Sequence, residues 1–239
     1  MRKSRTETDV GTRRGGKDSA DTVGVRGAGA VTWQARWGMK LNETDLLFAV
    51  RREPICKRTV VDVAYDMFAK GFTVEEISEK PDPAWSREVS KVLDGLNAKA
   101  CLTRLFLYER LFGWSILALT YVDYGKNPTK PVQGPREIRE LMPYSSFQCI
   151  VESSDEDRNP KSLRFGLPEF YRIRRADFTA SQEKIHFSRV IHCATRLLDH
   201  AWKGVPVLEV MYDDQTILRN ARWAVGETLV RTAAGFVFP

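Results

Sequence analysis

Histidine is the side chain best suited to proton transfer near neutral pH, and the 239 residues contain only three: His186, His192 and His200. The segment from His186 to Ser188 (HFS) has the H-x-S form of a two-histidine phosphoesterase motif. In that chemistry one imidazole acts as general base and the other as general acid, so a second copy of the motif is needed. The segment that begins at His192 (HCA) does not supply it. An enzyme that acts on nucleotides or nucleic acids through His186 and Ser188 is kept as an alternative hypothesis about function.

Motifs for binding metals or cofactors are sparse in this sequence. His186 and His192 stand at even spacing in a strand-rich stretch, but no carboxylate or thiolate accompanies them at ligand spacing. The four cysteines are more than forty residues apart, so there is no CxxC pair, and P-loop, GxSxG and HExxH motifs are absent. The acidic run Asp155–Asp157 is predicted to be a solvated loop. We expect no catalytic residue, metal or cofactor, which favours a binding or structural role.

Positive charge is concentrated in the first 40 residues. The formal net charge of the chain is +6, and residues 1–40 hold nine Lys and Arg against four Asp and Glu. Few large apolar side chains occur there, so the segment cannot bury enough surface to offset the entropy lost on ordering. We predict a disordered basic arm over residues 1–40, in which Arg13, Arg14 and Lys17 are candidate nucleic-acid contacts. A third hypothesis is an adaptor that binds nucleic acid through this arm and forms no ring.

Two tryptophans stand near the end of this arm. Trp33 and Trp37 are four residues apart. They are interpreted either as a short docking element, against the body or a neighbour, or as an aromatic pair beside the first helix.

The rest of the chain has the composition of a globular protein. Hydrophobic residues make up 43% and charged residues 28% of the sequence. The longest nearly uninterrupted apolar stretch, from Phe112 to Val122, is only about eleven residues and is too short to span a bilayer. The N-terminus lacks the apolar core of a signal peptide. We therefore expect a soluble, intracellular protein with reduced thiols.

Residues 41–239 show the patterns of a mixed body. Asn42 or Thr44 is placed to cap a short helix, and Pro54 suits the first turn of a longer one that ends near Gly71. Further helices are predicted over residues 84–112, with a break near 95–97, and from about 208 onward. Strands are predicted at 115–122, 147–151, 169–173, 184–187 and 190–193. The sequence thus predicts an α+β body over residues 41–239 after the arm.

Four stretches of this body resemble segments of one known family. They are Leu46–Val74, Tyr108–Tyr124, Ile185–Ile191 and Lys203–Val225. The first places an arginine and a proline before a helix (VDVAYDMFAKGF), and the second places a glycine before a hydrophobic strand (GWSILALTYV). The third is a short H-x-SRV segment, and the fourth is a helix start with Pro206 where serine is usual. Their order, over about residues 45 to 235, is similar to the N-terminal portion of tailed-phage (Caudovirales-type) portal proteins, in the phage-associated, portal-like branch.

The resemblance implies a wing region in which helices pack on short, mostly antiparallel strands. It implies a virion protein, assembled in the host cytoplasm into a homo-oligomeric ring of about twelve subunits, a dodecamer, at the capsid vertex. Double-stranded DNA is packaged and ejected through such a ring without specific contacts. The implied partners are the terminase motor, the capsid and the head-to-tail connector proteins, with no membrane and no cofactor. The family's stem helices and motor-facing clip are expected after the point where this sequence stops.

Arginines in the family-like stretches are candidate contacts of such a ring. Arg51 and Arg52 precede Pro54, and Arg189 belongs to the SRV segment. They are candidates for ion pairs between subunits or within the domain, or for solvated surface charges. The nearly neutral body also suits a conduit, because each phosphate that a protein neutralises strengthens its grip on DNA.

Overall fold

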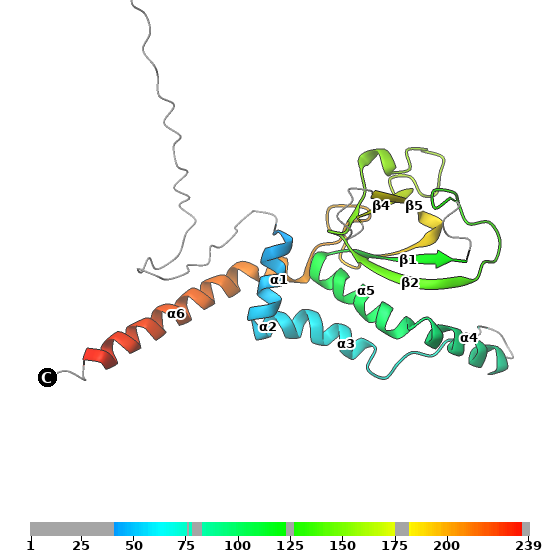
Figure 1. The fold of residues 1–239 in the computed structure, drawn as a ribbon. Coiled ribbons are helices and arrows are strands. Elements are labelled where there is room, and N and C mark those ends of the chain that lie inside the picture. The colour runs from blue at the N-terminus through cyan, green and yellow to red at the C-terminus, as the bar shows by residue number, and fades with distance from the viewer. Residues whose placement is uncertain (1–40, 76, 78–82, 123–126, 175–181, 236–239) are drawn as a thin grey trace, which may run out of the picture. The chain divides into compact units, whose positions relative to one another are not determined.

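The computed structural model describes residues 41–75, 77, 83–122, 127–174 and 182–235 (Figure 1). Internal contacts divide the chain into two compact units. The larger unit spans residues 40–212 and contains all the strands of the described part, whereas residues 213–235 belong to the smaller unit. The predicted division into an arm over 1–40 and a body over 41–239 remains a prediction, since the arm lies outside the described residues.

The first helix of the larger unit has the cap that the sequence predicts. Helix α1 (Glu43–Arg52) begins at Asn42, whose side-chain oxygen accepts a hydrogen bond from the Asp45 backbone N–H at 2.9 Å. The Asp45 carboxylate accepts in return from the Asn42 backbone N–H at 3.3 Å, which completes a capping box. Helix α2 (Pro54–Lys57) starts at Pro54, where the missing N–H costs no hydrogen bond, as predicted.

A widened helical turn follows α2. Residues Arg58–Asp62 form the π-helical segment η1, which leads into α3 (Val63–Met67). The Thr59 carbonyl in this turn accepts hydrogen bonds from Nε and Nη2 of Arg110, at 3.2 and 2.6 Å. Short π-helical segments like this one are uncommon within α-helices. Here the turn is fastened to the next long helix by a side chain 51 residues away.

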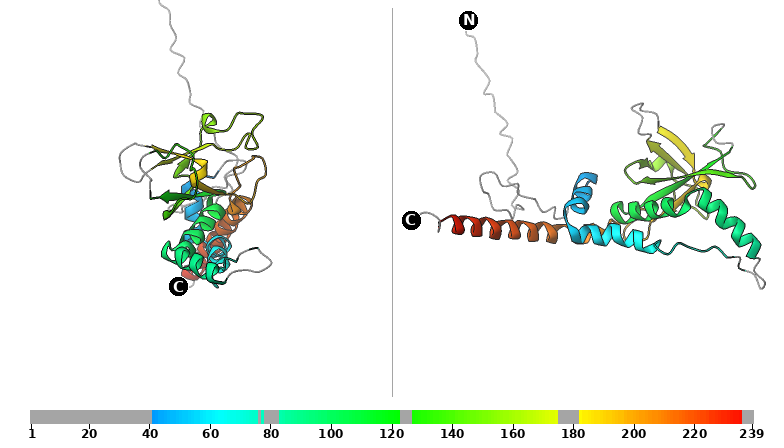
Figure 2. Two further views of the ribbon diagram at one scale, coloured as in Figure 1. Left: turned by 90° about the vertical axis from the view of Figure 1, so that its right-hand side faces the viewer. Right: turned by 60° about the horizontal axis from the view of Figure 1, so that its bottom comes forward.

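Two helices separated by a sharp break come next, and the second of them runs beside the sheets (Figure 1). Helix α4 (Pro83–Gly95) and helix α5 (Ala98–Phe112) meet at Asn97, which adopts a left-handed conformation with φ 51° and ψ 39°. This confirms the break predicted near residues 95–97. The C-terminal end of α5 packs in one apolar cluster with Leu41 and α1. From the other end of α5, α4 continues away from α1 (Figures 1 and 2).

The strands form two three-stranded antiparallel sheets. In the first, β1 (Ser115–Tyr121) lies between β2 (Ile138–Ser145) and β6 (Val190–Cys193). The second has the order β3 (Cys149–Ile150), β4 (Phe170–Arg174), β5 (Gln182–His186). Helix α5 packs against β1 and β2 (Figure 1). The α+β class and the antiparallel strand pairing are confirmed.

One of the two apolar cores lies between the two sheets. Its buried members are Trp114, Ile116, Ala118, Cys149, Tyr171, Ile173, Ile185 and Trp202. Because side chains alternate along a strand, Leu117 points to the opposite face of β1, where α5 packs. Ser115 also faces α5, since its hydroxyl donates a hydrogen bond to the Leu105 carbonyl at 2.7 Å. Strand β1 is therefore buried on both faces.

The strand predictions differ from the structure in two places. The strand predicted at 147–151 is confined to β3, and β2 was not predicted at all. Strand β2 contains Pro143 and two exposed charged residues, so its sequence lacks the run of β-branched and aromatic residues that marks a strand. Pro143 is tolerated because β2 pairs only with β1 and forms an edge of its sheet.

Two glycines allow the backbone to cross itself closely. Gly113, at the end of α5, has φ +90°, and a Cβ atom there would lie 2.3 Å from the Gly204 carbonyl oxygen. A Cβ atom on Gly204 would lie 2.2 Å from the Gly113 carbonyl oxygen. Only hydrogen fits at both positions, so the segment 194–206 is held directly against the end of α5.

The smaller unit consists, in its described part, of the last helix. Helix α6 (Tyr212–Gly235) begins a few residues after the predicted start near 208, because residues Val207–Val210 form the 3-10 turn η4. Five large apolar side chains along it are exposed: Leu218, Trp223, Val225, Leu229 and Val230. No helix in the described ranges combines the length and the apolar content that a membrane crossing requires.

Candidate functional site

The two residues of the enzyme hypothesis do come together. His186 Nδ1 lies 2.9 Å from the Ser188 hydroxyl and accepts a hydrogen bond from the Ser188 backbone N–H at 3.2 Å. Because Nδ1 accepts, the ring proton resides on Nε2. The Ser188 hydroxyl also accepts from the Val132 backbone N–H at 2.9 Å. The pair thus caps a tight turn and fastens the loop around Val132 to it.

His186 has the surroundings of a core residue. It is 7% exposed and its ring packs against Phe170 and Phe187. Burial lowers the pKa of His186, although the Glu169 carboxylate opposes the shift. His192 does not join this pair, because its two ring nitrogens contact the Trp202 carbonyl and the Tyr171 hydroxyl. The structure therefore gives His186 no second imidazole for acid–base catalysis, and the enzyme hypothesis finds no support in it.

His192 is held in an aromatic box within the core between the sheets. Its ring stacks on Trp114, with centroids 5.4 Å apart and an interplanar angle of 22°. Nε2 donates to the Trp202 carbonyl at 2.8 Å, and the Tyr171 hydroxyl lies 3.3 Å from Nδ1. Both nitrogens are thus satisfied in the neutral ring. Burial lowers the pKa of His192, and the hydrogen bond to the Trp202 carbonyl only partly offsets that shift.

The stability of the fold is expected to fall as the pH is lowered from 7 to about 5.5. A folded-state pKa below the ordinary value of about 6.5 means that the unfolded chain binds the proton more readily, so the stabilisation is complete above that value and declines below it. Each such histidine contributes at most about 1.4 kcal/mol per pH unit. Urea unfolding at a series of pH values should show a smaller slope for His192→Asn than for the unchanged chain. Equal slopes would contradict the assignment.

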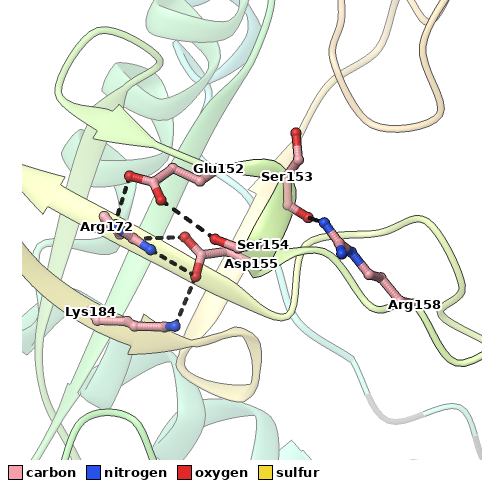
Figure 3. Close-up of polar contacts among 7 residues, drawn as sticks. All are labelled: Glu152, Ser153, Ser154, Asp155, Arg158, Arg172 and Lys184. Atoms are coloured by element: carbon pink, nitrogen blue, oxygen red, sulfur yellow. Dashed lines mark hydrogen bonds and ion pairs between the residues drawn. The ribbon is translucent and has the colours of Figure 1, made fainter.

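A buried carboxylate gathers two cations on the second sheet (Figure 3). Arg172 on β4 and Lys184 on β5 are paired across the strands, where two positive charges repel each other. Asp155, from the 3-10 turn Ser153–Asp155, accepts from Arg172 Nε at 2.7 Å and from Nη2 at 3.3 Å. Lys184 Nζ lies 2.8 Å from Asp155 Oδ1, the oxygen atom that also accepts from Arg172 Nη2, and the Glu152 carboxylate accepts from Arg172 Nη1 at 2.7 Å.

The prediction that the acidic run is a solvated loop was wrong for Asp155. The residue is 1% exposed. Burial alone would raise the pKa of Asp155, but hydrogen bonds from Arg172 and Lys184, together with their charges, lower it. The signal missing from the sequence is the pairing of β4 with β5, which brings together two basic residues 12 positions apart.

A second buried carboxylate anchors the segment 194–206. Glu109 on α5 is buried and accepts hydrogen bonds from the backbone N–H and the hydroxyl of Thr195. Arg196 Nη2 lies 3.7 Å from the same carboxylate. Together with the glycine crossing, these contacts fix the segment against α5. Within the described ranges no group of three or more His, Cys, Asp or Glu side chains is arranged to hold a metal ion.

The candidate arginines have different surroundings. Arg51 and Arg52 are exposed in the last turn of α1, and the Arg52 guanidinium lies 5.7 Å from the centre of the Phe48 ring. Arg189 is 6% exposed; its Nε donates to the Lys130 carbonyl at 3.4 Å and its guanidinium lies over the Tyr121 ring. Their part in subunit contacts remains a prediction. Arg13, Arg14 and Lys17 lie outside the described residues.

Comparison with known proteins points to one family. The model of the phage portal protein family matches residues 45–237. The fold resembles a chain from the neck of an empty gene transfer agent (GTA) particle, with 15% identity and a TM-score of 0.53, over 84% of this chain and 49% of that one. A chain from the virion of a native gene transfer agent particle is similar, with 16% identity and a TM-score of 0.51, over 86% of this chain and 48% of that one.

This chain spans about half the length of those two chains. No curated protein matches it. At such low identity the solved structures establish a shared fold alone, whereas the family model covers most of the sequence, in the order that the four family-like stretches predict. The chain therefore belongs to the phage portal protein family.

Proposed function

We propose that this chain is a structural subunit of a portal in the virion of a phage or a phage-like particle. The observation that carries the proposal is the match of the portal family model to residues 45–237. The fold shared with chains of gene transfer agent particles supports it. In this function the protein acts by assembling with copies of itself, and it needs no catalytic centre.

Closing a ring requires two different surfaces on each subunit, because head-to-tail contacts are not self-complementary. The larger unit exposes large apolar side chains on several separate elements: Ile55, Tyr65, Met67, Phe72, Trp85, Val92, Leu163, Phe165, Leu197 and Leu198. Exposed apolar side chains that gather in patches mark interaction surfaces. Their distribution over helices and loops is consistent with contacts on more than one side of the subunit.

We propose that the ring holds about twelve copies and that double-stranded DNA passes through it. The charge distribution supports the passage of DNA. Residues 1–40 carry +5 of the net charge of +6, so the remainder is close to neutral. A wall that neutralised many phosphates would bind DNA tightly through counterion release, whereas a nearly neutral wall lets it slide. The terminase motor, the capsid and the head-to-tail connectors are the partners that we propose for such a ring, in the virion and during its assembly in the host cytoplasm.

Light scattering coupled to size exclusion tests the proposal directly. The purified chain, at rising concentration, is expected to shift from the mass of one subunit toward a closed species of about twelve subunits. Electron micrographs of that fraction should show rings. A protein that remains a monomer at every concentration would count against the proposal. Turnover of a nucleotide or nucleic acid that is lost in His186→Ala would support the enzyme hypothesis instead.

A further inference from the structure

Helix α4 carries an apolar stripe that lacks a cover in the described part of the chain. Trp85, Val89 and Val92 follow one another at spacings of four and three residues, which places them on one side of the helix. Trp85 is 42% and Val92 60% exposed, and no residue of α4 is buried. The charged residues Arg87, Lys91 and Asp94 lie on the other side. A helix this amphipathic is expected to pack against another apolar surface.

The arm contains a segment of matching chemistry. Trp33 and Trp37 are the only aromatic residues among the first 40 and stand four positions apart. Side chains at this spacing are neighbours on one face wherever a chain is helical. The charges are complementary as well. The arm holds nine basic residues against four acids, whereas residues 75–82, directly before α4, hold four acids against one basic residue. Opposite charge would steer the arm to the start of this helix, and the tryptophans would supply the apolar contact.

The reach of the chain decides which copy of α4 the arm meets. Trp37 is four residues before Leu41, a distance of at most about 14 Å when fully extended. Leu41 is buried at the C-terminal end of α5, beside Phe112. The 15 residues of α5 span about 21 Å, and α4 continues beyond their far end (Figures 1 and 2). Trp37 therefore cannot reach α4 of its own chain.

The geometry points to an exchange between neighbouring subunits: the segment Val31–Trp37 of one copy lies on the Trp85–Val92 face of α4 in the next copy. This inference rests on the proposed function, because it assigns one contact of the ring. The contact is head-to-tail, since the arm and α4 are different surfaces. Each subunit gives an arm to one neighbour and receives an arm from the other, as a closed ring requires.

Disulfide trapping between two variants of the full chain tests the contact. Gly38→Cys places a thiol next to Trp37 without removing either tryptophan. Glu88→Cys places one beside the apolar stripe, and Asp94→Cys places one on the opposite side of the same helix. The last two changes each remove one exposed acid, so they are matched in charge. The linked peptides are identified by mass spectrometry, which separates them from products of the native cysteines.

Mixing Gly38→Cys chains with Glu88→Cys chains under mild oxidation is expected to give a linked pair. The mixture with Asp94→Cys should give about tenfold less, because a disulfide forms only where the two Cα atoms come within about 7 Å. Equal yields from the two mixtures would overturn the inference. A chain that carries both Gly38→Cys and Glu88→Cys serves as a further check, since a link that forms only within that chain would also overturn it. Light scattering on the same samples records whether rings form. Rings without the link would overturn this contact and leave the proposed function intact, whereas monomers without the link would count against both.

Discussion

Asp155→Ala is expected to lower the free energy of unfolding by about 2–4 kcal/mol. The substitution removes the only acceptor that Lys184 has among the described contacts, and it leaves Arg172 with Glu152 alone. Two cations would then face each other across β4 and β5 without the carboxylate between them. The loss is smaller than for a fully buried pair, since the Arg172 and Lys184 side chains are 25% and 39% exposed and water screens them in part.

Urea unfolding followed by circular dichroism measures this loss. Asp199→Ala removes an exposed acid of the same larger unit and is expected to change stability by no more than about 0.5 kcal/mol. Adding Lys184→Met to Asp155→Ala should recover part of the loss, because it removes the stranded charge. If Asp155→Ala unfolds at the same urea concentration as the unchanged chain, the ion cluster does not stabilise the second sheet.

Leu117→Asp is expected to prevent folding of the larger unit. Leu117 is 2% exposed at the centre of β1, where it faces α5 and pairs with Pro143 and Ile191 on the flanking strands. An aspartate there would be a buried charge in apolar surroundings, which costs several kcal/mol or more. That cost is comparable to the whole stability of a domain, typically about 5–15 kcal/mol. Thermal unfolding should show no cooperative transition.

A milder variant keeps this second prediction measurable. Leu117→Ala leaves a cavity and is expected to cost about 2–5 kcal/mol, within reach of denaturant unfolding. Val122→Asp changes an exposed residue directly after the same strand and should be nearly neutral. Unchanged unfolding of both Leu117 variants would mean that β1 is not the central strand of the core.

Helix starts and breaks, which depend on a few neighbouring residues, were predicted correctly from the sequence. The capping residue Asn42, the proline Pro54 and the break beside Asn97 all have the predicted roles, because caps and breaks depend on residues within one helical turn. Strand β1 was predicted because both of its faces are apolar. Strand β2 was missed because an edge strand needs neither a continuous apolar run nor freedom from proline.

The sequence predicted less of the polar centres than of the fold. The H-x-S spacing singled out His186 and Ser188, but it did not predict that both side chains hold one turn together. The burial of Asp155 depends on the register of β4 against β5, and the burial of Glu109 on a segment 86 residues away. Such pairings arise from the topology of the sheets, so no local pattern reveals them.

The crossing of Gly113 over Gly204 also limits how this part of the chain can change in evolution. The segment from Thr195 to Gly204 is fixed at both ends. Thr195 is held by its hydrogen bonds to Glu109, and Gly204 is held by its backbone contact with Gly113. Added residues therefore fit only at the outer tip of this segment, around Leu197 and Leu198, which already extend into solvent. Length differences between homologues should concentrate at that tip, while the two glycines stay constant.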